Sequence, residues 1–319
     1  MKNFIQILVV CFTFVFVQSC GQNKKEDKVK DKVTSEKSTN VATTSYDSDV
    51  LLKHIKTLSS DKFEGRKTGT EGNKKAQDYI VTQFKSLEIK PFGSDYKHNF
   101  QFKRKAKTFD ATNVLAMVEG TEHPKTYIVI SAHYDHLGMS KDGKIYNGAD
   151  DDASGVAALF AFAEMLKANP PKHSVILAAF DAEEMGLQGA KYFVDKMKDT
   201  NIIANINMDM ISRSSKNELY AVGSRYTEGL KTLISEFKNP TETKLLVGHD
   251  GADGKEDWTF ASDHGPFHRA EIPFLYFGNE DHAAYHKPTD DFEDITPEFY
   301  KNSVTIIHAV FRDLDAKGL

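Results

Sequence analysis

The sequence predicts an α/β fold, a single three-layer domain in which a mostly parallel mixed sheet is covered by helices on both faces. Apolar residues at helical spacing alternate along the chain with short, nearly continuous apolar runs, which is typical of such a sheet. Polar residues of metal-binding types follow several of these runs, where α/β proteins place their sites. Both patterns lie within residues 46–319, long enough for one large core.

The N-terminal residues 1–20 predict a signal peptide of the lipoprotein type. Lys2 is followed by an apolar run, 4–17, which is too short to span a bilayer core of about 30 Å. The stretch VQSC resembles a bacterial lipobox, so Cys20 is expected to carry lipid and to anchor an exported protein to a membrane of the cell envelope. Ordinary signal cleavage, with Cys20 incidental, is the alternative.

Residues 21–45 are polar, contain no aromatic residue and predict a disordered tether. The other cysteine, Cys11, lies inside the signal, so the mature chain is expected to have no disulfide. The net charge of −5 and the absence of a basic stripe argue against nucleic acid as a partner.

The expected helices and strands follow from the spacing of apolar residues and from the capping residues and prolines between them. Helices are expected at 51–58, 76–87, 154–169 and 227–237. A last helix starts with Thr296 as N-cap and Pro297 at the first position, and its apolar face comprises Val304, Ile307, Val310, Phe311 and Leu314. Strands are expected at 98–102, 113–118, 127–132, 175–180, 202–208, 219–222 and 273–277.

Acids and histidines gather in 131–155, between two apolar runs. His133 and Asp135 share a face of an extended chain, so Asp135 either orients His133 or is itself a ligand. Three adjacent carboxylates at 150–152 precede a helix that Asp152 or Ser154 is expected to cap. Caps and turn residues alone would explain such a triplet, but buried carboxylates need pairing or a metal, and we expect a metal.

Residues of metal-binding types follow three of the predicted strands, at the same edge of the sheet. His133 follows one strand, the pair Glu183 and Glu184 follows another, and Asp209 follows a third. Each alone has an ordinary explanation, such as a helix start or a turn. Their recurrence at strand ends favours a site.

Five stretches in order, HYDHLG, GADDDASG, FDAEEMGLQGA, NINMDM and YHKPTDDFEDI, resemble the motifs of the co-catalytic dizinc aminopeptidases of clan MH. The resemblance covers residue 51 to the C-terminus, and the short gap 110–113 leaves no room for a protease-associated insert. It implies a metallo-aminopeptidase with two Zn²⁺ per chain and peptide substrates with a free N-terminus. Manganese or cobalt would also suit these ligands.

Carried over residue by residue, the resemblance makes His133 and Asp209 ligands of one zinc and Glu184 and His286 ligands of the other. Asp150 becomes the carboxylate that bridges both ions. His282 is an alternative to His286, which the YHKPTDD match favours.

The resemblance also implies roles around the metals. Glu183 becomes the general base, Tyr285 a donor to the tetrahedral intermediate, and Asp135 the partner of His133. Asp151 is expected to be joined to Asp150 by a cis peptide. Asp263, with His264, is expected to support the site wall.

Two other functions share this fold: a glutaminyl-cyclase-type transferase, which works with one zinc, and a catalytically inactive binding module. Specificity is left open, because Trp258, Phe260 and Phe267 suit a pocket wall or the core. The stretch 248–257 suits a calcium loop or, more simply, a solvated turn.

Overall fold

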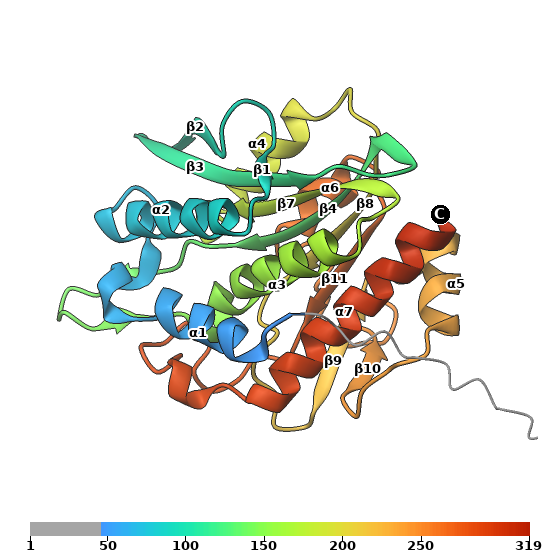
Figure 1. The fold of residues 1–319 in the computed structure, drawn as a ribbon. Helices are drawn as coiled ribbons and strands as arrows, with labels where there is room; N and C mark the ends of the chain where they lie inside the picture. The colour runs from blue at the N-terminus through green and yellow to red at the C-terminus, as the bar shows by residue number, and fades with distance from the viewer. Residues whose placement is uncertain (1–45) are drawn as a thin grey trace, which may run out of the picture. The chain divides into compact units, whose positions relative to one another are not determined.

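A mixed sheet of nine strands forms the centre of the molecule in the computed structural model, which describes residues 46–319. The predicted signal peptide, Cys20 and the tether lie outside the described residues. The strand order is β1-β3-β7-β4-β8-β11-β9-β10, with β2 also pairing with β3 (Figure 1). The central strands β7, β4, β8 and β11 run parallel, and antiparallel pairs join β3 to β7 and β9 to β11.

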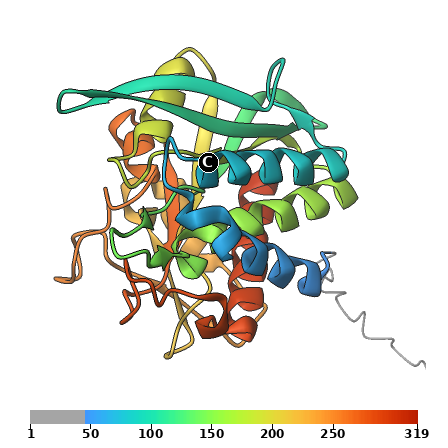
Figure 2. The same cartoon turned by 90° about the vertical axis from the view of Figure 1, so that its left-hand side faces the viewer.

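The strands of this sheet are β1 (Lys90–Pro91), β2 (Lys97–Arg104), β3 (Lys107–Val118), β4 (His123–His133), β7 (His173–Phe180), β8 (Ile202–Met208), β9 (Glu218–Val222), β10 (Lys244–Val247) and β11 (Phe274–Gly278). A separate two-stranded ribbon consists of β5 (Gly138–Met139) and β6 (Ile145–Tyr146). The β2–β3 hairpin runs across the top of Figure 2, above α2.

Helices cover both faces of the sheet (Figure 1). The larger core lies under α1 (Ser48–Leu58), α2 (Glu71–Ser86), α3 (Ser154–Ala168), α5 (Glu228–Glu236) and α7 (Pro297–Lys317). The smaller core lies under α4 (Gln188–Lys196) and α6 (His264–Arg269). Strand residues alternate between the cores: Ile128 and Ile130 of β4 face the larger one, and Val129 faces the smaller one.

The predicted fold class is confirmed. The strand 202–208 has the predicted bounds, and α7 begins with Thr296 as N-cap and Pro297 behind it. The helices α4 and α6 and the strand β10 were not predicted, because they are short and are defined by what they pack against. Among the described residues, no helix is both long and apolar enough to cross a membrane.

Candidate metal centre

The carboxyl ends of the parallel strands bring the predicted residues together. His133 is the last residue of β4, and Asp209 directly follows β8. Glu183 and Glu184 lie in the connection from β7 to α4, and His286 lies in the loop after β11. Together with Asp151 and Tyr285, these residues line one cavity of about 550 Å³.

His133, Asp151 and Asp209 form the first group. His133 Nε2 lies 3.1 Å from Asp151 Oδ1 and 3.5 Å from Asp209 Oδ1. His133 Nδ1 lies 3.0 Å from the carbonyl oxygen of Asp135, which can only accept, so Nδ1 carries the proton. The lone pair of a neutral ring is therefore on Nε2, which faces the carboxylates and is available to a metal.

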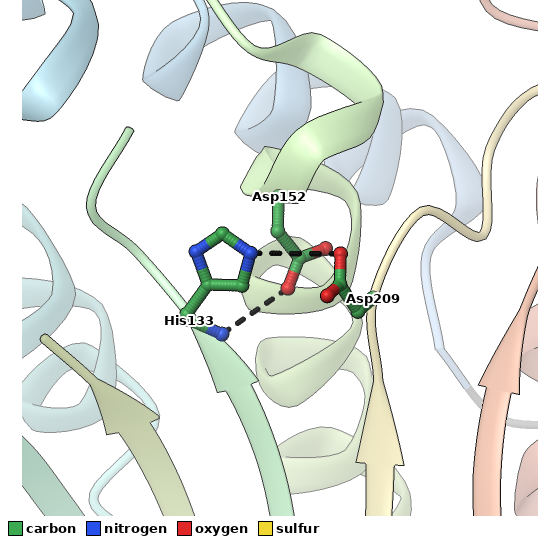
Figure 3. A group of neighbouring side chains, drawn as sticks. All are labelled: His133, Asp152 and Asp209. Atoms are coloured by element: carbon green, nitrogen blue, oxygen red, sulfur yellow. Dashed lines mark hydrogen bonds and ion pairs between the residues drawn. The ribbon is translucent and has the colours of Figure 1, made fainter. Parts of the chain in front are cut away.

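Asp152 also lies beside His133 and Asp209 (Figure 3). Its Oδ2 accepts from the backbone N–H of His133, and its Oδ1 accepts from the N–H of Gly155 in the first turn of α3. The N-cap position of α3 is occupied by Ala153, so the prediction that Asp152 or Ser154 is the N-cap was wrong, although Asp152 does accept from an amide of the first turn. With both oxygens engaged by backbone donors, Asp152 is a weaker ligand candidate than Asp151.

His286, Glu184 and the other oxygen of Asp151 form the second group. His286 Nε2 lies 3.2 Å from Asp151 Oδ2 and 3.5 Å from Glu184 Oε2. Because Asp151 Oδ1 faces His133 while Oδ2 faces His286, this carboxylate lies between the two groups. The sequence had predicted this position for Asp150.

The placement of Asp150 between the groups was wrong. Its Oδ1 accepts from the backbone N–H and hydroxyl of Ser212, and its Oδ2 lies 3.2 Å from Asn279 Nδ2 and 3.0 Å from His282 Nε2. These donors occupy both oxygens, which leaves no lone pair turned toward the cavity. His282, the alternative ligand, is likewise used in holding Asp150. The cis peptide joins Asp151 to Asp152, not Asp150 to Asp151.

The backbone before α3 determines which aspartate faces the cavity. Gly148 has φ 56°, and a Cβ there would lie 2.1 Å from the carbonyl oxygen of Asp151, so glycine is required. Asp290 accepts from the backbone N–H groups of Asp150 and Asp151. Arg66 donates to the carbonyls of Gly148 and Asp151. The chain is thereby fixed with Asp151 facing inward and Asp150 facing Ser212.

Asp135 contacts His133 differently from the prediction. The acceptor for His133 Nδ1 is the backbone carbonyl of Asp135, and the nearest carboxylate oxygen, Oδ1, is 3.7 Å away. That Oδ1 accepts from the backbone N–H of Glu183 at 2.9 Å, while Oδ2 accepts from the Thr68 hydroxyl. The side chain of Asp135 therefore positions Glu183 more directly than it positions His133.

Glu183 faces the cavity beside the first group. Burial raises its pKa well above the usual range, and the charges of Asp263, Asp209 and Glu184 raise it further against the opposing effect of His133. Burial also raises the pKa of Asp263, whose carboxylate oxygens have no hydrogen-bond partner among the described residues. A glutamate with a raised pKa can accept a proton and return it near neutral pH.

Of the remaining predicted residues, Tyr285 lines the cavity and its ring stacks on His286 at 3.9 Å between ring centroids. Burial raises the pKa of Tyr285, so its hydroxyl stays a donor. Trp258 and Phe260 also line the cavity. Phe267 belongs to the smaller core instead. In the 248–257 stretch, Asp253 accepts from the backbone N–H groups of His249 and Lys255, as expected of a turn.

The shifted pKa values in the second group show that its nitrogen and oxygen atoms share protons. Hydrogen bonds to Asp151 and Glu184 raise the pKa of His286 to about 10. Burial would raise the pKa of Asp151, but His136, His133 and His286 hold it well below its usual value. These side chains therefore share protons at the same atoms that would bind a divalent cation, and the cation would displace those protons.

One residue of the second group, His136, was not predicted; it follows His133 by three positions. His136 Nδ1 lies 2.8 Å from Glu184 Oε1 and 3.7 Å from Asp151 Oδ2. Its membership of the HYDHLG stretch was the available signal. Because the residue lies in a loop, no strand or helix periodicity indicated which way it points.

The residues present fit zinc. Every candidate ligand is a carboxylate oxygen or an imidazole nitrogen, the donors that zinc uses in catalytic sites. Oε1 of Glu184 is buried without a hydrogen-bond partner among the described residues, although His136 Nδ1 lies beside it. Such an atom is expected to have a partner that the polypeptide does not supply. A metal ion is such a partner.

Known proteins resemble this chain in sequence and in fold. Aminopeptidase YwaD of Bacillus subtilis is 28% identical over 262 residues, which is 77% of this chain and 52% of that protein. The alkaline phosphatase isozyme conversion protein of Escherichia coli is 31% identical over 211 residues, 61% of this chain and 57% of that protein. The chain thus spans about half the length of these curated relatives.

Among solved structures, the Legionella pneumophila LapA aminopeptidase superposes with a TM-score of 0.68 at 18% identity, covering 92% of this chain and 78% of that one. A glutaminyl cyclase of Bacteroides thetaiotaomicron gives 0.66 at 15% identity, covering 86% of this chain and 99% of that one. At such identities these structures establish the fold alone. Residues 113–311 match the sequence profile described as Peptidase family M28. The family resemblance predicted from the motifs is therefore confirmed, and the chain belongs to peptidase family M28.

Proposed function

We propose that the chain is a zinc-dependent aminopeptidase that removes N-terminal residues from peptides, with two zinc ions and Glu183 as general base. The observation that carries this proposal is the position of Asp151, whose two oxygens face two separate groups of ligand atoms. His133 and Asp209 would complete the first zinc site, and Glu184 and His286 the second. Asp151 replaces Asp150 as the proposed bridge.

When bound, zinc would lower the pKa of the attacking water and would stabilise the negative charge that develops on the scissile carbonyl oxygen. Glu183 lines the same cavity, held by Asp135 through its backbone N–H. In the proposed reaction Glu183 accepts the proton of the attacking water and transfers it to the leaving amine. Tyr285 would donate its hydroxyl proton in a hydrogen bond to the developing oxyanion.

The charges around the cavity support peptides as substrates. Glu256 and Asp281 line the cavity and favour a protonated amino terminus, while Arg104 and Lys191 also line it and favour a carboxylate. This combination suits short peptides with both ends free.

Three reporter substrates test the reaction: a leucine chromogenic amide, its N-acetylated form, and an N-acetylated peptide with the reporter at its C-terminal bond. An aminopeptidase cleaves only the first. Cleavage of the acetylated substrate contradicts the amino-terminal specificity. Cyclisation of an N-terminal glutamine peptide, with no cleavage, indicates the glutaminyl-cyclase alternative. Zinc binding without any turnover indicates an inactive binding module.

The roles of the two adjacent glutamates are separated by a matched pair of variants. Glu183→Gln should keep both zincs and lose about 100- to 10,000-fold in turnover, because it removes only the base. Glu184→Gln should lose one zinc and require added metal. Zinc per chain is measured beside the turnover rate. A Glu183→Gln protein that lacks one zinc, or a fully active Glu184→Gln protein with both, contradicts the assignment.

We also propose that the enzyme is exported and held at a membrane of the bacterial envelope through lipid on Cys20. This proposal rests on the N-terminal sequence, which lies outside the described residues. Cys20→Ala should move the protein to the soluble fraction and leave the activity of the purified enzyme unchanged. An Ala variant that still fractionates with membranes contradicts the lipid anchor.

A further inference from the structure

His136 is a buried imidazole whose position has no explanation in packing alone. It is 1% exposed, and neither ring nitrogen has a hydrogen-bond partner among the described residues. Its Nδ1 nevertheless lies 2.8 Å from Glu184 Oε1, an oxygen that also lacks a hydrogen-bond partner there. The two atoms are close without the alignment of a hydrogen bond, which is expected when both face a common cation.

The position of the His136 ring is set by the segment that carries Asp151. A Cβ at Gly148 would lie 2.7 Å from Cδ2 of His136, so any other residue there would displace the ring or the backbone. The ring is therefore packed against the backbone just before Asp151, with Nδ1 turned to the carboxylates. This arrangement fixes Nδ1 relative to the second group.

The distances match those between ligands of one ion. Two atoms that each lie about 2.1 Å from zinc are about 3.0 Å apart at a right angle and about 3.4 Å apart at the tetrahedral angle. His136 Nδ1 lies 2.8 Å from Glu184 Oε1 and 3.7 Å from Asp151 Oδ2. His286 Nε2 lies 3.2 Å and 3.5 Å from Asp151 Oδ2 and Glu184 Oε2. One of the four distances, 3.2 Å, lies inside this range, and the other three, 2.8, 3.5 and 3.7 Å, lie within about 0.3 Å of it.

We propose that His136 is a further ligand of the second zinc, binding through Nδ1 beside Asp151, Glu184 and His286. The inference rests on the proposed two-zinc function and adds a fourth protein ligand to one of its sites. The first group has Asp151, His133 and Asp209 and no comparable additional imidazole among the described residues. The second site is therefore the tighter one and keeps its ion when free zinc is scarce.

Zinc affinity of the full chain tests this asymmetry. His136→Leu should leave one zinc bound with unchanged affinity and weaken the other by at least about 10- to 100-fold, measured by competition with a chromogenic chelator. His308→Leu is the matched control, since His308 packs on Phe162 and Phe311 in the core and should not alter either affinity. Circular dichroism and thermal unfolding show whether each variant is folded.

X-ray absorption of the zinc-loaded protein gives a readout independent of any variant. With His133, His136 and His286 on two ions, the wild-type protein should show about 1.5 imidazoles per zinc, and His136→Leu about 1.0. A wild-type average of about 1.0, or a folded His136→Leu protein with both affinities unchanged, overturns the proposal. A wild-type chain that binds only one zinc contradicts the two-metal function. In that case two imidazoles on the single ion support His136 as a ligand beside His286, and one imidazole overturns it.

Discussion

Replacing Arg66 with methionine should destabilise both the fold and the metal centre. Arg66 is 1% exposed, and its guanidinium donates to backbone carbonyls of three separate segments that meet beneath the site. The acceptors are Leu58, Tyr134, Asn147, Gly148 and Asp151. Methionine fills a similar volume but donates to none of these oxygens, and it removes the positive charge that Arg66 places near Asp151, Asp152 and Asp290.

The expected cost is about 3–5 kcal/mol, the range for removing one partner from a buried charged network. Each buried carbonyl left without a donor costs about 1–3 kcal/mol, but the loop relaxes and the losses are not additive. Arg66→Lys keeps the charge and offers three N–H donors, so it should fall between wild type and Arg66→Met. Zinc affinity should weaken as well, because Tyr134 lies between His133 and Asp135 in the chain and its carbonyl is one of the acceptors.

Urea unfolding of the zinc-free protein measures the stability, and chelator competition measures zinc affinity. Arg312→Met is the control, because Arg312 is near the surface and donates to a single carbonyl, that of Asn169. It should change the unfolding free energy little. An Arg66→Met protein within about 1 kcal/mol of wild type, with unchanged zinc affinity, refutes the proposed role of this network.

Two further predictions concern His308, a half-buried histidine, and Asp135, which accepts from the backbone N–H of the proposed base Glu183. Burial lowers the pKa of His308 from 6.5 to about 4 in the folded chain, so the unfolded chain binds the proton first and stability falls as pH drops through this window. Between pH 7 and pH 5 the free energy of unfolding of His308→Leu should therefore fall by about 2 kcal/mol less than that of wild type, as measured by urea unfolding. The same pH dependence in both proteins would contradict the lowered pKa of His308. Asp135→Asn should lower turnover about 10- to 100-fold and alter zinc affinity less. The reason is that the carboxylate of Asp135 holds the Glu183 N–H, whereas its backbone carbonyl, which the substitution keeps, holds His133. A variant that loses zinc but has normal turnover once zinc is restored would contradict this prediction.

The sheet could be predicted because its strands are buried on both faces and therefore show as continuous apolar runs. The edge of the sheet at which the site lies followed from the same pattern, since His133 and Asp209 come directly at or after strand ends. The helix α4 escaped prediction because only a few of its residues, such as Ala190 and Phe193, are buried. Short elements of this kind depend on tertiary contacts that no local pattern records.

The choice among three adjacent aspartates could not be made from residue types. Asp150, Asp151 and Asp152 are chemically identical, and the direction of each side chain depends on the backbone at Gly148 and on the contacts of Asp290 and Arg66. These partners lie far away in the sequence. The roles of the individual residues in metal binding and catalysis stay predictions.

Anomalous diffraction at the zinc absorption edge, on crystals of the zinc-loaded protein, tests the central claim most directly. Two peaks about 3.5–4 Å apart are predicted, one against each oxygen of Asp151, with His133 and Asp209 at the first and Glu184 and His286 at the second. A single peak, or two peaks on either side of Asp150, would contradict the account.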